Sequence, residues 1–326
     1  MSNLIQVYTD EIFNPDKNGP SVTTVGTFDG VHLAHQEILR SLAASDDGNC
    51  VRTVVTFEPH PQSIKLHRPG VMPTLSSTPE KIRLLRACGA DRVYILKFDE
   101  ALSSLSAETF LQDILLDRLN TRKLIVGYNH SFGEDRQGNI EFLESAKERF
   151  GFELEVVGPH YVADETVSST KIRKALDTGD VEKATQLLGR FYNLSGTVVM
   201  GRGVGRELKV PTANLRLIYQ EKLIPKVGVY AVAVRSGGKV YPGMLNIGTR
   251  PTFGAGAVTI EVHLIEFDGD LYDQIITLLF LKRLRDEVRF SNKETLITKM
   301  HKDREDTLEV FSEFPESTFQ VDLNKI

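Results

Sequence analysis

Two histidines three residues apart are the first residues of the sequence that could do chemistry. His32 and His35 lie in the segment TVGTFDGVHLAHQEIL (24–39), after a β-branched stretch and a turn that contains two glycines. At this spacing their side chains share one face of the first turn of a helix. Free backbone N–H groups and the helix dipole favour an anion there. The pattern indicates donors to a phosphate, although two polar residues on a helix surface would have the same spacing.

The elements that must position this pair alternate up to about residue 185. Short β-branched runs are separated by helical patterns, which predicts a parallel sheet covered on both faces. One helix start is indicated by Thr78-Pro79-Glu80, which is typical of a cap, a proline at the first helical position and an acid in the first turn. The expected strands are 22–26, 51–57, 92–96, 123–127 and 153–158.

Three unusual loops follow three of these strands. They are GTFDG after the first strand, FEPHP (57–61) after the second and VGYNHSFG (126–133) after the fourth. Ligands of parallel sheets bind at the carboxyl ends of the strands. The loops are therefore expected to share one rim, and this favours the phosphate interpretation of the histidines.

The pattern changes near residue 190. Strand-like segments now follow one another with glycine and proline turns, which predicts a small antiparallel barrel. A last helix is expected to begin at Ser291, and a helix over 179–190 with Asp180 as its cap is expected to connect the domains. The predicted domains are 1–185 and 186–326. The expected barrel strands are 192–200, 228–235, 239–246, 258–265 and 275–281.

Composition narrows the class of protein. The chain has 326 residues, is 41% hydrophobic and carries a net charge of −5, so nothing predicts a nucleic-acid or membrane surface or an obligate protein partner. Cys50 and Cys88 are the only cysteines, which suits a reducing compartment. The first residues do not resemble a signal peptide, and the aliphatic run 275–281 is far shorter than the ~20 residues of a membrane helix. We expect a cytoplasmic protein.

Two motifs together resemble a known family. GTFDGVHLAH is similar to the His-x-x-His motif of nucleotidyltransferases, in the form found in bacterial bifunctional riboflavin kinase/FAD synthetases. VSSTKIRKAL (167–176) resembles the Ser-Ser-Thr-x-x-Arg element of that family. The resemblance extends from about residue 20 to 315. It implies a Rossmann-like α/β domain that adenylylates FMN to FAD with release of pyrophosphate. It also implies a β-barrel kinase domain, with a C-terminal helix, that phosphorylates riboflavin to FMN.

The resemblance also implies roles for residues of the first domain. His32 and His35 would stabilise charge on the α-phosphate of ATP, and Arg173 would grip phosphate oxygens with its planar fork. Ala34 stands where the family usually has glycine, and residues 129–131 (Asn-His-Ser) depart from the usual acid and Phe-Arg. These departures leave the fine contacts to adenine, ribose or magnesium open. The implied nucleotide-binding residues are Gly26, Phe28, Asp29, Asn129, Ser168, Ser169, Thr170 and Arg173.

The segment VVMGRGVGRELKVPTANL (198–215) resembles the Pro-Thr-x-Asn motif of riboflavin kinases. Magnesium takes oxygen ligands and keeps several waters. The resemblance therefore implies that Thr212 and Asn214 bind Mg²⁺ together with the phosphates of ATP. Backbone N–H groups at three turn glycines would approach those phosphates. These glycines are Gly201, Gly203 and Gly205.

Period-2 alternation in VTIEVHLIEF (258–267) supplies one more candidate. It places Val258, Ile260, Val262 and Leu264 on one face and Thr259, Glu261 and His263 on the other. A polar strand face is usually only solvated. The resemblance, however, places a catalytic acid here, and NIGTRPTFG and DGDLYDQ match kinase segments in order. Glu261 is thereby implied as the general base that accepts the ribityl hydroxyl proton.

Two other functions stay open at this point. Because the departures fall in the first site, the chain could be an enzyme with only the kinase activity. It could also be a degenerate flavin- or nucleotide-binding regulatory protein, although a pure binder has no need of a base. Products formed from riboflavin, ATP and magnesium distinguish these functions: FAD indicates two active sites, FMN alone the kinase, and no turnover the binder.

Overall fold

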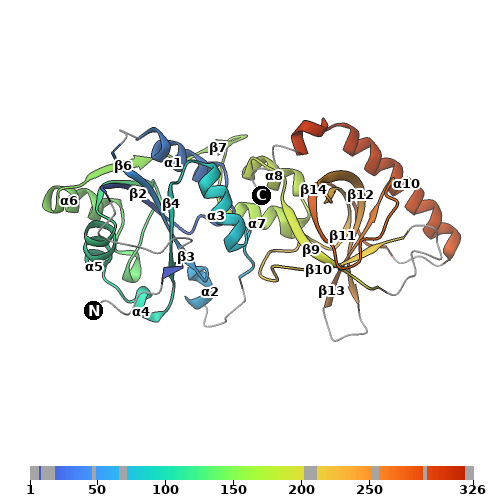
Figure 1. The fold of residues 1–326 in the computed structure, drawn as a ribbon, viewed down its shortest axis with the longest axis horizontal. Coiled ribbons are helices and arrows are strands. Elements are labelled where there is room, and N and C mark those ends of the chain that lie inside the picture. Colours follow the sequence, from blue (N-terminus) through green and yellow to red (C-terminus); the bar gives the residue numbers. More distant parts are fainter. Residues whose placement is uncertain are drawn as a thin grey trace. The chain divides into compact units, whose positions relative to one another are not determined.

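The computed structural model describes residues 7–8, 19–45, 49–65, 72–201, 211–250, 257–288 and 292–319 (Figure 1). The chain forms two compact units, one up to Ser169 and one from Thr170 onward. The division thus falls earlier than the predicted boundary at 185/186, which stays a prediction.

The first unit is built on a six-stranded sheet with the order β1-β4-β3-β2-β5-β6. All neighbours from β4 to β6 are parallel, and β1 pairs antiparallel with β4 at the edge. The predicted parallel sheet is confirmed, whereas the two-residue β1 was not predicted. The strands are β1 Val7–Tyr8, β2 Ser21–Val25, β3 Val51–Glu58, β4 Arg92–Lys97, β5 Thr121–Gly127 and β6 Glu153–Val157.

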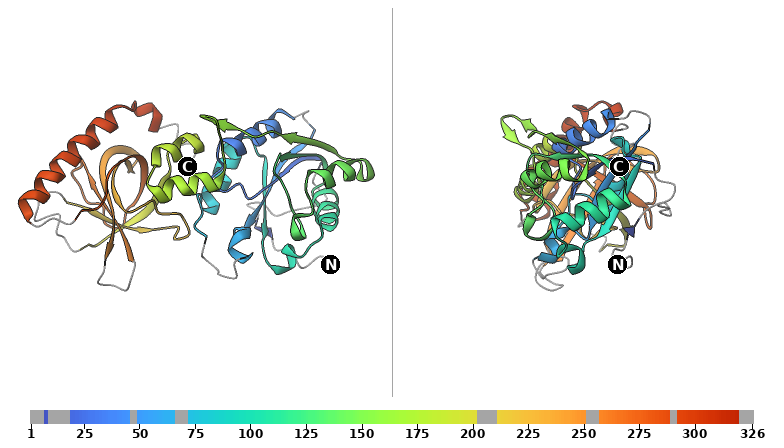
Figure 2. Two further views of the ribbon diagram at one scale, coloured as in Figure 1. Left: turned by 180° about the vertical axis from the view of Figure 1, so that it is seen from behind. Right: turned by 90° about the vertical axis from the view of Figure 1, so that its left-hand side faces the viewer.

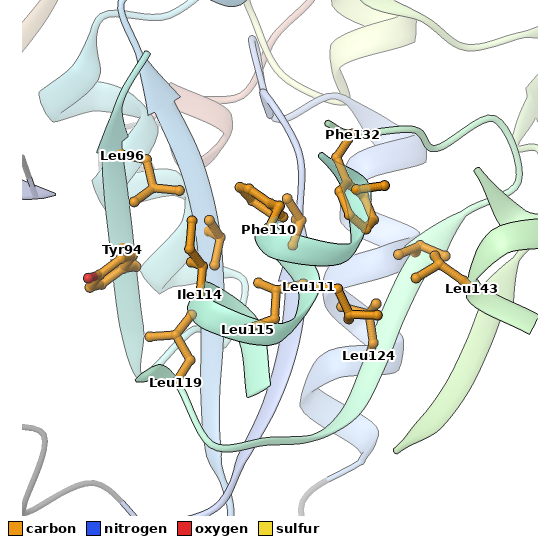
Figure 3. Packing of buried hydrophobic residues seen from close by; sticks show 14 of the residues in the cluster. Tyr94, Leu96, Phe110, Leu111, Ile114, Leu115, Leu119, Leu124, Phe132 and Leu143 are labelled. Atoms are coloured by element: carbon orange, nitrogen blue, oxygen red, sulfur yellow. The ribbon is translucent and has the colours of Figure 1, made fainter. Parts of the chain in front are cut away.

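Helices cover both faces of this sheet, because neighbouring residues of β5 belong to different cores. Ile125 packs in one core with leucines of α1 and α3. Leu124 and Val126 pack in the other core with η2 and α6, as Figure 3 shows for Leu124 and the labelled residues of η2. The helices are α1 Leu33–Ala44, α2 Pro61–Lys65, α3 Thr78–Ala87, α4 Glu100–Ser103, α5 Ala107–Thr109, η2 Phe110–Arg118, η3 Glu134–Arg136 and α6 Ile140–Phe150. A short hairpin, β7 Tyr161–Val162 and β8 Glu165–Thr166, follows β6.

The start of α3 corrects one prediction. The cap is Ser77, not Thr78: Ser77 Oγ accepts from Glu80 N at 3.4 Å, and the Glu80 carboxylate accepts from Ser77 N at 3.2 Å. This reciprocal pair is a capping box, which needs a spacing of three residues. The Thr78 hydroxyl instead donates to Glu58, at the end of β3.

The second unit contains a closed antiparallel barrel with the order β10-β13-β12-β11-β14-β9, as predicted. Its strand β10, which follows the Pro-Thr-x-Asn motif, was not predicted. The helix α10 (Lys293–Ser312) lies along the outside of the barrel against β11, β12 and β14 (Figures 1 and 2). The strands are β9 Asn193–Val199, β10 Ala213–Leu217, β11 Gly228–Ser236, β12 Lys239–Arg250, β13 Ala257–Leu264 and β14 Ile275–Arg285.

The C-terminal helix is confirmed, but its predicted start is corrected. Asn292 caps α10 by accepting from Thr295 N at 2.8 Å, and Ser291 lies outside the described residues. An asparagine at this place supplies the side-chain oxygen that an N-cap needs. In the part of the chain that the structure describes, no helix is long and apolar enough to cross a membrane.

Two helices precede the barrel, α7 (Ser169–Thr178) and α8 (Val181–Leu188). Asp180 caps α8 as predicted, accepting from Lys183 N at 3.0 Å. The α8 helix packs against β14, and the C-terminal part of α7 accepts a hydrogen bond at Leu176 O from Lys226 N at 3.0 Å. The segment predicted to connect two domains therefore packs on the barrel.

Candidate active sites

The turn between β2 and α1 is tightly built. Gly26 N donates to Val55 O at 3.0 Å, which continues the pairing beyond β2. The chain then passes through Phe28, Gly30 and Val31 with φ of 48°, 80° and 37°. Such values strain residues other than glycine. The side chains of Phe28 and Val31 are buried, and this packing holds the strained turn in place.

The two histidines form a stacked pair at the end of that turn. His32 is the N-cap of α1, and its Nδ1 accepts from His35 N at 3.4 Å. The ring centroids are 3.6 Å apart with an angle of 14° between the planes. Because Nδ1 accepts, a neutral His32 carries its proton on Nε2. The structure thus brings together both residues that the spacing singled out, at the start of a helix.

Asp29 anchors the turn to a segment distant in sequence. Its buried carboxylate accepts from Leu75 N at 2.9 Å and from Ser76 N at 3.2 Å. The Ser76 hydroxyl in turn accepts from Gly30 N at 3.0 Å. These bonds fix the backbone before His32, so Asp29 positions the turn.

A hydrogen bond connects the second motif to the first. Ser169 Oγ donates to Asp29 O at 3.0 Å, although the two residues are 140 positions apart in the sequence. Ser169 begins α7, and Ser168 precedes it directly. Thr170 and Arg173 follow on α7 in the second unit.

Lys81 on α3 is a residue of this region that the sequence analysis missed. Its Nζ is buried and donates to Phe57 O at 3.2 Å and to Thr27 O at 3.4 Å, which ties the ends of β2 and β3 together. Burial lowers the pKa of Lys81, while Glu58 and Asp29 act in the opposite direction. The helical spacing of Lys81 with the buried Leu84 and Leu85 could have shown that this lysine faces inward.

The turn after β5 carries Asn129 and His130. His130 N donates to Gly127 O at 2.9 Å, and the Asn129 side chain is exposed. A Cβ on Gly127 would lie 3.1 Å from Cδ1 of Ile38 on α1, so this strand end packs against the helix that begins after His32. Burial, with a smaller effect from Arg136, lowers the pKa of His130 to about 4.

The low pKa of His130 predicts an acid-sensitive stability. Between the pKa of an unfolded histidine, about 6.5, and the folded value of about 4, the unfolded chain binds a proton that the folded one does not. Stability should therefore fall as the pH drops through this window, by up to about 3 kcal/mol. The free energy of unfolding of the first unit can be measured with urea at pH 7 and pH 4.5. It should fall less between these two pH values in H130F than in the natural protein. Equal losses would contradict this assignment.

In the barrel, three polar residues form one row across adjacent strands. Glu261 on β13 pairs directly with Asn214 on β10 and with Asn246 on β12. Directly paired residues point to the same side of a sheet. Alternation along β13 agrees with the predicted faces: Ile260, Val262 and Leu264 are buried, and Thr259, Glu261 and His263 are partly exposed. Val258, at the start of the strand, is 42% exposed.

Gly201 lies close beside the side chain of Asn214. A Cβ on Gly201 would be 2.1 Å from Nδ2 of Asn214, so the absence of a side chain makes room for the amide. His263 Nδ1 lies 2.8 Å from Pro211 O and donates to it, which holds the segment before Thr212 against β13. Burial is the main cause that lowers the pKa of His263. Gly203 and Gly205 lie outside the described residues.

The donor set beside Gly201 suits magnesium. Thr212 offers a hydroxyl oxygen and Asn214 an amide oxygen, and Mg²⁺ is commonly bound by few protein oxygens plus substrate phosphates. Among the described residues, no group of three or more His, Cys, Asp and Glu side chains could hold a metal by itself. Two protein oxygens leave most positions around such an ion to phosphates and water.

Comparisons with known proteins agree for both units. A model of the FAD synthetase family matches residues 14–171, and a model of the riboflavin kinase family matches residues 188–311. A bifunctional riboflavin kinase/FMN adenylyltransferase from Pseudomonas fluorescens is 39% identical over 291 residues, which is 89% of this chain and 92% of the relative. The protein of that name from Escherichia coli K12 is 36% identical over 295 residues, again 89% and 92%.

A solved structure supports the same two-unit fold. It is named a macrolide-efflux protein from Streptococcus pneumoniae, has a TM-score of 0.82 and 30% identity, and the match covers 91% of this chain and 97% of that one. That name describes the other protein only. The kinase-only and regulatory-binder alternatives are not favoured, since relatives with both activities align along most of the chain. The chain belongs to the bifunctional riboflavin kinase/FMN adenylyltransferase family, and it converts riboflavin to FMN and FMN to FAD.

Proposed function

We propose that His32 and His35 stabilise the charge that develops on the α-phosphate of ATP when the FMN phosphate attacks it. The observation that supports this is the stacked pair at the start of α1, where His32 Nδ1 accepts from His35 N. The attacking FMN phosphate is already anionic and needs no base. The site must therefore hold the two phosphates in line and stabilise charge, which donors at a helix N-terminus can do.

The phosphates of ATP are bound, in this proposal, by the start of α7. Ser168, Ser169 and Thr170 offer hydroxyl groups, and Arg173 offers a bidentate fork. The hydrogen bond from Ser169 to Asp29 O supports a link between this serine and the histidine turn. Gly26, Phe28 and Asn129 contribute nucleotide contacts, and Asp29 positions the turn.

Riboflavin phosphorylation has a different requirement, because its nucleophile is a neutral hydroxyl. We propose that Glu261 accepts the proton of the ribityl hydroxyl as it attacks the γ-phosphate of ATP. The direct pairing of Glu261 with Asn214 supports this role, since it sets a carboxylate beside a magnesium ligand. Thr212 and Asn214 hold Mg²⁺, which neutralises phosphate charge when bound. Gly201, Gly203 and Gly205 let backbone N–H groups approach the same phosphates.

The division of labour between the units can be tested with fragments. We expect a fragment from residue 170 to 326 to phosphorylate riboflavin and to make no FAD. The fragment 186–326, which follows the predicted boundary, should also be active but less stable, because it lacks most of α8, including the buried Val181 and Ala184. Product chromatography and thermal melts followed by circular dichroism measure both properties. A fragment 170–326 that is folded yet inactive with riboflavin and ATP would contradict the assignment.

A further inference from the structure

One buried nitrogen in the first unit has no part in the chemistry described above. His130 Nε2 is enclosed and has no hydrogen-bond partner among the described residues, although the ring as a whole is partly exposed. Buried polar atoms in native proteins nearly always have a partner, and leaving one unpaired destabilises the fold. An unpaired atom of this kind therefore points to a ligand that pairs with it.

The ring is held in place by its neighbours. The backbone N–H of His130 donates to Gly127 O at 2.9 Å, and the ring lies 5.6 Å from that of Phe132. Phe132 is buried in the core, and a Cβ on Gly138 would lie 2.8 Å from its ring. Because these contacts already hold the His130 ring, a hydrogen bond from this ring to a ligand would remove little side-chain conformational entropy.

The turn lies at the functional edge of the sheet. It follows the carboxyl end of β5, and β5 pairs directly with β2, the strand before the histidine turn. Ile38 of α1 approaches Gly127, so the same helix borders both turns. Substrates of parallel sheets bind at this edge.

The chemistry of the side chain narrows the ligand. With a pKa of about 4, His130 is neutral at physiological pH and presents one N–H donor and one lone pair. A heteroaromatic ring with both donors and acceptors can pair with Nε2 in either tautomer, whereas a phosphate dianion only accepts. FMN and ATP both carry such a ring, the isoalloxazine and the adenine.

We propose that His130 Nε2 forms a hydrogen bond to the heteroaromatic ring of a substrate of the adenylyltransferase site and thereby sets specificity for it. This inference rests on the assignment of the rim at β2 and β5 to FAD synthesis. The hydrogen bond to the substrate would then satisfy a nitrogen that has no partner among the described residues.

The test compares H130F and H130Q in the full chain. Phenylalanine keeps a ring but removes both nitrogens, so the KM of one substrate in FAD synthesis should rise about 3- to 10-fold. Its thermal midpoint should rise by roughly 2–4 °C, because the unpaired nitrogen is gone. Glutamine keeps a donor and an acceptor and should restore much of the KM. A higher KM for FMN identifies the flavin as the ligand, and a higher KM for ATP identifies the adenine.

The matched control is H160F. His160 lies in the same unit, but its Nδ1 already pairs with Glu37 Oε1 at 3.2 Å, so this change should raise neither KM nor the midpoint. Riboflavin phosphorylation should be unchanged in all three variants. Unaltered KM values for both substrates in H130F would overturn the inference. If H130F folds poorly, H130A decides by the same measurement.

Two different failures can be told apart. If FAD synthesis survives removal of the His32 and His35 rings, the assignment of the rim is wrong. If it is lost in those variants while H130F keeps both KM values, the rim is right and only the role of His130 is wrong.

Discussion

Glu261→Gln should abolish most FMN formation while leaving FAD synthesis from supplied FMN close to its original rate. Glutamine keeps the size and most hydrogen bonding of the side chain but removes the carboxylate that accepts a proton. A lost acid–base group lowers the rate by roughly 10²–10⁴. Binding of riboflavin and ATP should be nearly normal, so the loss should appear in kcat for riboflavin phosphorylation, measured by product chromatography.

Thr259→Val is the matched control for that variant. Thr259 lies two residues away on the same partly exposed face of β13, and its hydroxyl donates to Gly248 O at 3.5 Å, a marginal hydrogen bond. If the face is merely solvated, E261Q and T259V should both be nearly silent. If Glu261 is the base, only E261Q loses FMN formation. Loss of FAD synthesis from FMN in E261Q would show a coupling between the two activities that these assignments do not contain.

Local sequence patterns predicted those helices and strands that are marked by one clear signal, such as periodicity or an apolar run. Period-2 alternation placed Glu261 on the outer face of its strand, and the parallel strands stood out as apolar runs. The strand β10 was missed because a proline and a polar Thr-Ala-Asn segment hide a short run, Ala213–Leu217. The cap of α3 was misplaced by one residue, because Thr78 and Ser77 are both good caps and only the reciprocal bond with Glu80 decides between them.

The parts of the site that could not be predicted depend on contacts between distant segments. The motif indicated Asp29, but its carboxylate binds the backbone at Leu75 and Ser76, which no local pattern reveals. Lys81 belongs to no motif. It ties two strand ends together by donating to backbone carbonyl groups that are far from it in the sequence. Residue types at short spacing can therefore identify the reacting groups, whereas the residues that position them depend on the fold.

Removing the imidazole rings of His32 and His35 should lower FMN adenylylation by orders of magnitude and leave riboflavin phosphorylation nearly unchanged. Each lost donor to a developing charge lowers the rate by roughly 10²–10³. A double alanine variant, however, would also remove the N-cap of α1, since His32 Nδ1 accepts from His35 N. Loss of a cap alone destabilises a helix by about 1 kcal/mol, so alanine does not separate folding from catalysis.

Two single variants make that separation. H32N keeps a good capping oxygen, because asparagine is among the preferred N-caps, but lacks the ring. H35F keeps a ring that can stack on His32 and meet Phe28, whose centroid lies 5.1 Å from that of His35, but has no donor. If the histidines act on the phosphate, both variants should melt near the natural temperature and still lose FAD synthesis. If the pair only supports the helix, both variants should keep FAD synthesis, since H32N retains the cap and H35F retains the stacking.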